Sequence, residues 1–187
     1  MKHIAAFLLA MCITANAQTA QAADWVVDHT KSQLGFSVQW QDRPFTGLFR
    51  NWDAQITFDP QNLDHAKAVV KVDIASVTSG SDEMDQGLKS AEGFDAPVYS
   101  TAIFETTWFR ATGKNTYEAR GNLTLHGITR AISLPFKLQI KDNIASMRGT
   151  AAVTRTDFRV GMGQWASEYP VAHQVNVIVD LVAKKAK

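Results

Sequence analysis

Histidines are the residues of this chain best suited to proton transfer or metal binding. Four lie beyond residue 22, namely His29, His65, His126 and His173, and none stands four residues from another. Without an HExxH motif or a Cys/His cluster, this spacing matches no metal-binding pattern. His126 precedes Gly127 between two apolar-alternating runs, which predicts a four-residue hairpin loop beginning at His126. The sequence therefore predicts no metal site and a structural role for His126.

Acidic side chains in the segment 81–95 are the second candidate for chemistry. Two carboxylates on either side of a glycosidic bond can act as acid and base. The same segment has the composition of a short surface helix, with Ser81 as a candidate N-cap and acids in its first turn. These acids therefore either form a solvated helix face or serve catalysis. In the second case the protein is a small periplasmic hydrolase that uses Asp85, Glu92 or His126.

The chain carries none of the longer motifs of catalysis or cofactor binding. It has no G-x-S-x-G elbow, no P-loop and no dinucleotide-binding glycine pattern. Its five Trp, three Tyr and ten Phe either fill a core or form the walls of a pocket for an apolar small molecule. We therefore expect a protein that is not an enzyme, has no catalytic residues and uses no cofactor. A filled, ligand-free interaction module of the stress response is a further alternative.

Residues 1–22 have the pattern of a cleaved signal peptide. Lys2 precedes a short apolar stretch, and Ala20-Gln21-Ala22 matches an A-x-A cleavage site. Cleavage there leaves one domain over residues 23–187, in which basic and acidic residues balance at 18 each. This balance gives no reason to expect a nucleic-acid partner. The expected location is the periplasm, without stable insertion into a membrane.

Period-two alternation of apolar and polar residues runs through the rest of the chain, which is typical of half-buried strands. The predicted strands occupy residues 34–40, 52–58, 70–74, 102–108, 117–125, 132–140, 147–153 and 175–181. Near-continuous hairpin connections favour a sheet closed on itself, because closure removes exposed edges. The expected fold class is all-β, an eight-stranded antiparallel barrel with one short helix over the segment 81–91.

An ordered set of short motifs resembles the YceI family of exported, lipocalin-like lipid-binding proteins. The motifs are Trp25-Val26-Val27-Asp28, Gly47-Leu48-Phe49, Ile56-Thr57-Phe58-Asp59-Pro60, Leu88-Lys89-Ser90, Gly127-Ile128-Thr129-Arg130 and Arg155-x-Asp157-Phe158. Together they span the chain from residue 25 to about residue 182. The chain departs from the usual pattern at Gly93, where the family commonly has an aromatic residue.

This resemblance implies a lipocalin-like barrel around an apolar pocket that sequesters a long isoprenoid or quinone-type lipid, with no catalysis. We expect the lining to come from the inward faces of the strands: Phe36, Val38, Trp40, Trp52, Ile56, Phe104, Leu123, Phe136, Leu138 and Val177. Arg43, Arg50 and Lys89 are candidates for contact with a polar head group at the mouth. The expected partner is an apolar small molecule or lipid, and a homodimer is left open.

Overall fold

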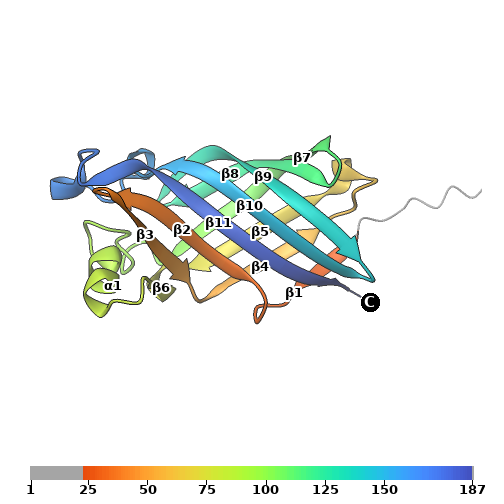
Figure 1. The fold of residues 1–187 in the computed structure, drawn as a ribbon, viewed down its shortest axis with the longest axis horizontal. Helices are drawn as coiled ribbons and strands as arrows, with labels where there is room; N and C mark the ends of the chain where they lie inside the picture. The colour runs from red at the N-terminus through yellow and green to blue at the C-terminus, as the bar shows by residue number, and fades with distance from the viewer. Residues whose placement is uncertain (1–22, 187) are drawn as a thin grey trace, which may run out of the picture.

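The computed structural model describes residues 23–186, and strands make up most of them (Figure 1). The predicted signal peptide lies outside the described residues. The strand segments are β1 (Asp24–Val27), β2 (Gln33–Trp40), β3 (Arg43–Phe49), β4 (Trp52–Thr57), β5 (Lys67–Asp73), β6 (Val77–Thr78), β7 (Thr101–Gly113), β8 (Thr116–Leu125), β9 (Ile128–Lys141), β10 (Ile144–Thr154) and β11 (Val171–Lys185). The helical elements are α1 (Asp82–Lys89) and the 3-10 turns η1 (Leu63–His65), η2 (Ile74–Ser76), η3 (Arg155–Phe158) and η4 (Gly163–Trp165).

All strand segments belong to one antiparallel sheet that closes on itself. Its order is β1-β4-β5-β7-β8-β9-β10-β11-β2-β3-β6, and β1 also pairs with β11. Both β1 and β2 pair with β11, one after the other along its length, so they act as a single interrupted strand. In the same way β3 and β4 form one interrupted strand, because β3 pairs with β2 and β4 pairs with β1. The segments β5 and β6 form another, because they pair with β4 and β3. The described segments therefore form an eight-stranded barrel, as predicted.

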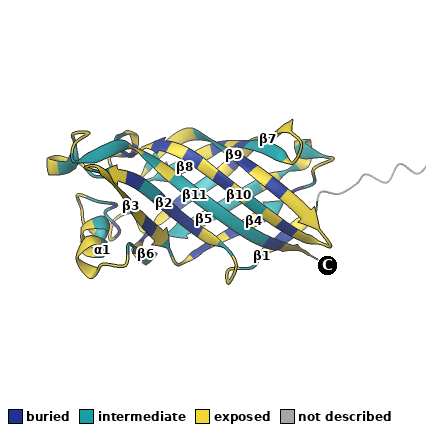
Figure 2. Ribbon diagram, viewed as in Figure 1, coloured by how far each residue is buried: buried dark blue, intermediate teal, exposed yellow. Residues whose placement is uncertain are grey.

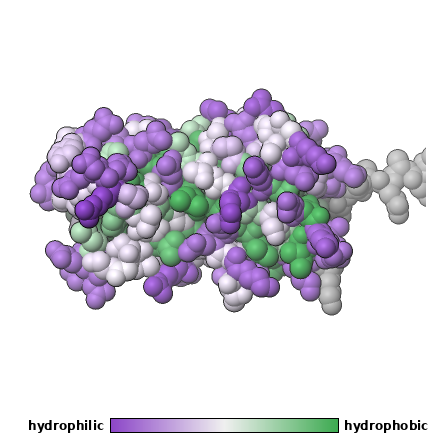
Figure 3. Space-filling model, viewed as in Figure 1, coloured by the Kyte–Doolittle hydropathy of each residue, from purple (hydrophilic) through white to green (hydrophobic). Residues whose placement is uncertain are grey.

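Side chains alternate between the interior and the outer surface along each strand, which produces the banded burial in Figure 2. Hydrophilic residues predominate on the outer face drawn in Figure 3, with smaller apolar areas between them. Among the described residues no helix has the length and apolar character needed to cross a membrane.

The segment β3 is the main strand that the alternation did not predict. Pro44 and Gly47 interrupt its apolar pattern, and both residue types are depleted in strands. The segment nevertheless pairs with β2 over its whole length, and Phe45 and Phe49 reach the core. Gly47 fits because its missing side chain leaves room for Phe36, whose ring would lie 2.5 Å from an added Cβ.

The hairpin at His126 is shorter than predicted. Leu125 pairs with Ile128, so the loop consists of His126 and Gly127 alone instead of four residues. Both have positive φ, 52° and 70°, the conformation of a two-residue type I′ turn. The even loop length was expected from the alternation, and it keeps the apolar faces of β8 and β9 on one side of the sheet.

The two ends of the barrel differ in construction. One end carries α1, the loop that follows it and the segment 155–170, which lie together at the left of Figure 1. Aromatic rings pack near the other end, where Phe58 contacts Phe109, Tyr117 and Phe136 at centroid distances of 5.2, 5.6 and 6.3 Å. The space between these ends holds the candidate site.

Candidate functional site: an apolar cavity inside the barrel

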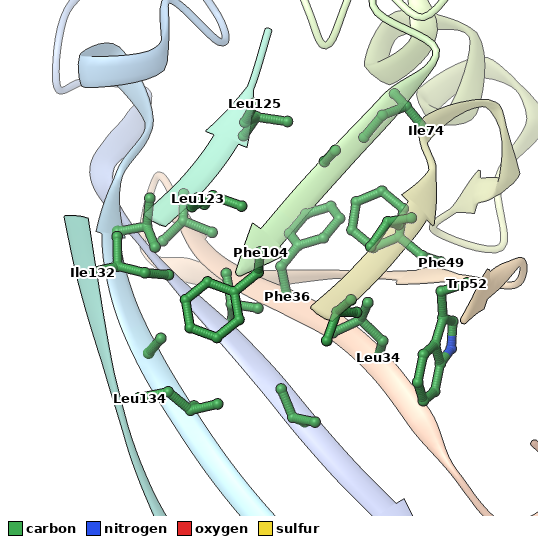
Figure 4. Close-up of a pocket in the computed structure, with 18 of the residues that line it drawn as sticks. Leu34, Phe36, Phe49, Trp52, Ile74, Phe104, Leu123, Leu125, Ile132 and Leu134 are labelled. Carbon is green, nitrogen blue, oxygen red and sulfur yellow. The ribbon is translucent and has the colours of Figure 1, made fainter. Parts of the chain in front are cut away.

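A cavity of about 800 Å³ occupies the barrel interior. Its lining extends from Trp25 and Phe58 near the aromatic end to Leu88 and Phe94 at the α1 end. Figure 4 shows side chains from several strands pointing into the shared space, among them Phe36, Leu123 and Ile132. The volume lies within the ~300–1,000 Å³ range of small-molecule sites, and the walls are almost wholly hydrocarbon.

Every apolar residue predicted to face the interior lines this cavity. The set comprises Phe36, Val38, Trp40, Trp52, Ile56, Phe104, Leu123, Phe136, Leu138 and Val177. The alternation was sufficient to place them, because each stands on the inward phase of a strand whose other phase is polar. Contact of these residues with a ligand stays a prediction.

The three predicted head-group cations lie outside the cavity lining. Arg43 is exposed at the start of β3, and Lys89 is in the last turn of α1. Arg50 is exposed between β3 and β4, where its backbone N–H donates to the Ser76 carbonyl at 3.2 Å. Their contact with a head group stays a prediction, but the described lining contains none of them.

Residues in irregular segments complete the α1 end of the cavity. Phe94, in the loop after α1, is 9% exposed and packs against Phe36 and Phe49 at centroid distances of 6.2 and 5.8 Å. Trp165, in η4, contacts Trp40 at 5.5 Å. The positions of Phe94 and Trp165 could not be predicted from the sequence, because no periodic pattern marks a buried ring in a loop.

Arg155 holds the segment that crosses this end of the barrel. The residue is 5% exposed, and its guanidinium has no carboxylate partner among the described residues. It donates instead to backbone carbonyl oxygens of Val160, Gly161, Trp165, Ser167, Val171 and Ala172. Burial lowers the pKa of Arg155 below its ordinary value, but the group stays protonated at any physiological pH. One side chain thus ties residues 160–172 to the end of β10.

Each residue proposed for a hydrolase contacts a different partner. Asp85 accepts hydrogen bonds from the backbone N–H and the hydroxyl of Ser79, at 2.5 and 2.7 Å. Glu92 accepts a hydrogen bond from Gln164 at 3.1 Å, and the ring of His126 lies 4.3 Å from that of Tyr99 between centroids, tilted by 41°. Within residues 23–186 no three acidic, histidine or cysteine side chains gather as a metal site.

The sequence profile of the YceI-like domain matches residues 25–183 of this chain. The chain belongs to the YceI-like family. A UPF0312 protein of Vibrio cholerae is 38% identical over 117 residues, a match that covers 60% of this chain and 61% of that relative. The chain therefore aligns with about three fifths of the length of that relative.

Two solved structures share the fold of this YceI-like chain. BcnA of Burkholderia cenocepacia is 28% identical, with a TM-score of 0.82 over 84% of this chain and 99% of BcnA. A polyisoprenoid binding domain from Saccharophagus degradans, implicated in plant cell wall breakdown, is 16% identical. Its TM-score is 0.68, and the match covers 88% of this chain and 99% of that domain.

The departure of this YceI-like chain at Gly93 has a steric cause. An added Cβ at Gly93 would lie 2.3 Å from the Leu88 carbonyl oxygen and 2.6 Å from that of Gly87. The backbone N–H of Phe94 donates to the same Leu88 oxygen at 2.8 Å. Glycine thus allows the chain to turn back onto the end of α1 and to place Phe94 in the cavity wall.

We expect Asp85 to anchor α1 in a pH-dependent way. Hydrogen bonds from Thr78 and from Ser79 hold the pKa of Asp85 below its ordinary value. The ionised form is therefore favoured in the folded state, and its stabilisation is present above the unfolded-state pKa and lost as pH falls through the folded-state pKa. The Asp85→Asn variant should be less stable than wild type at neutral pH and equally stable in acid.

Urea unfolding at neutral pH and in acid measures the difference in stability between Asp85→Asn and wild type. Asp82→Asn is the matched control, because it removes a carboxylate from the same first turn without touching Ser79. A constant stability difference between Asp85→Asn and wild type at all pH values would contradict the prediction.

Proposed function

We propose that this YceI-like protein binds a long apolar lipid of the isoprenoid or quinone type inside the barrel and carries it without chemical change. The observation that carries the proposal is the continuous apolar cavity of about 800 Å³ in a closed barrel. The structural neighbour described as a polyisoprenoid binding domain has the same fold and supports the ligand class.

Simple magnitudes indicate which part of such a ligand dominates affinity. A tail that loses roughly 600 Å² of apolar surface to the cavity gains about 15 kcal/mol at ~25 cal/mol per Å². Association opposes this with ~4–15 kcal/mol. One neutral hydrogen bond to a head group contributes only ~0.5–1.5 kcal/mol. The tail therefore supplies most of the affinity, and the head group adjusts specificity.

Native mass spectrometry of protein purified from its own cell compartment tests the proposal. We expect an added mass that organic extraction releases and that corresponds to a prenyl lipid. Ligand-free protein that also fails to take up any added prenyl lipid would contradict it. Binding with turnover of the lipid would instead favour an enzyme.

The proposed carrier acts in the periplasm after removal of residues 1–22. Cell fractionation and N-terminal sequencing check this, with Ala23 expected as the first residue of the mature chain. Retention of the full-length chain in the cytoplasm would contradict it. A homodimer stays a prediction, which light scattering of the purified protein can test.

A further inference from the structure

Few charged side chains border the cavity, and they differ in their capacity to form a hydrogen bond with a ligand. Among the described lining residues they are Glu83, Glu92 and Arg155. Glu83 lies in the first turn of α1, and Glu92 follows that helix by three residues. Arg155 is the first residue of η3, directly after β10. All three therefore stand at the α1 end, where a polar head group would lie if an apolar tail filled the barrel.

Arg155 cannot offer a hydrogen bond to a ligand. A guanidinium has five N–H donors. The Nε group of Arg155 donates to Ala172, Nη1 donates to two carbonyl oxygens, and Nη2 faces three. Every donor is therefore taken up by the backbone of residues 160–172, and recruiting one for a phosphate would open that segment.

The two carboxylates, by contrast, keep free acceptor capacity. Glu92 receives one bond, from Gln164 Nε2 at 3.1 Å, and a carboxylate offers about four lone-pair sites. Glu83 is exposed on α1 beside Met84, which also borders the cavity. The neighbouring Ser90 hydroxyl already donates to the Gly87 carbonyl at 2.8 Å. The lining at this end thus offers negative charge and hydrogen-bond acceptors.

We infer that Glu83 and Glu92 select ligands whose head group donates hydrogen bonds and carries no negative charge, such as an alcohol or an ammonium, and that they disfavour phosphates. This inference rests on the proposed binding of an apolar tail and adds a specificity determinant to it. It also differs from the expectation from sequence, in which Arg43, Arg50 and Lys89 are the candidates for contact with a polar head group.

Three probes that share one tail isolate the head group: farnesol, farnesylamine and farnesyl phosphate. Quenching of tryptophan fluorescence reports binding, because Trp40, Trp52 and Trp165 border the cavity. We expect farnesyl phosphate to bind about tenfold more weakly than farnesol, since like charges within a few ångströms repel, and farnesylamine to bind most tightly. Raising the salt concentration should reduce the differences in affinity among the three probes, because salt screens charges and these carboxylates are solvent-exposed.

The double variant Glu83→Gln/Glu92→Gln should bring the three affinities within about threefold, because it removes the charge and keeps the shape. Asp82→Asn is the matched control, since Asp82 lies on the same helix turn but outside the lining, and it should keep the wild-type spread. Equal binding of farnesol and farnesyl phosphate by wild type would overturn the inference while leaving tail binding intact. Failure of all three probes to bind would overturn the proposed function itself.

Discussion

Replacing Arg155 with alanine is expected to lower the free energy of unfolding by about 3–5 kcal/mol, because it removes a buried network of hydrogen bonds from a charged donor to backbone carbonyl oxygens. The change leaves carbonyl oxygens of residues 160–172 without their donor in a part-buried setting. Each unsatisfied buried acceptor costs ~1–3 kcal/mol, and partial access of water limits the total. Chemical denaturation monitored by far-UV circular dichroism measures the loss.

Arg148→Ala is the matched control for this prediction. Arg148 lies on β10, which directly precedes Arg155, but its side chain is 81% exposed and pairs with Asp180 at the surface. An exposed ion pair contributes only ~0–1 kcal/mol, so this variant should stay close to wild type. Arg155→Lys should be nearly as unstable as Arg155→Ala, because one ammonium cannot reach the spread of carbonyls that the guanidinium fork serves. Equal stability of the two alanine variants would contradict the role assigned to Arg155.

The regular part of the fold could be predicted from the sequence because alternation encodes it directly. A residue such as Leu138 is placed inside the barrel by its phase alone, without knowledge of its neighbours. The alternation also predicted a loop with an even number of residues at His126, although the loop is two residues shorter than expected. The alternation does not predict β3, because Pro44 and Gly47 interrupt its apolar pattern. The segment forms a strand because it pairs with β2 in the folded barrel.

The α1 end of the site could not be predicted in this way. Phe94 and Trp165 enter the wall from irregular segments, where no periodicity fixes the direction of a side chain. Arg155 resembles any strand-end arginine in the sequence, and only its backbone acceptors reveal its role. The sequence offers Arg43, Arg50 and Lys89 as head-group contacts, whereas the fold places Glu83 and Glu92 at the lining. The roles of these residues depend on where the irregular segments lie in three dimensions, and sequence spacing does not encode that for loops.

The second large effect is expected from the cavity itself. Ala151 on β10 is 2% exposed and lines the cavity. An Ala151→Phe change places a benzyl group in the space that we assign to the lipid tail. If the ring displaces one five-carbon isoprenoid unit, at about 0.8 kcal/mol per buried methylene, binding weakens by ~4 kcal/mol, or about a thousandfold. Titration with a long prenol, followed by tryptophan fluorescence, measures this loss.

Ala152→Phe makes the same substitution one residue later, on the exposed outer phase of the same strand. Because successive side chains point to opposite faces, this ring projects away from the cavity and should leave prenol affinity unchanged. The Ala151→Phe barrel should remain folded, with a stability cost no greater than the ~1–3 kcal/mol typical of overpacking, because the ring enters space that other side chains leave open. A short prenol that needs less of the cavity should lose less affinity than the long one. If the two variants bind the long prenol equally well, the tail does not lie along Ala151, and the interior of the barrel is not the binding site.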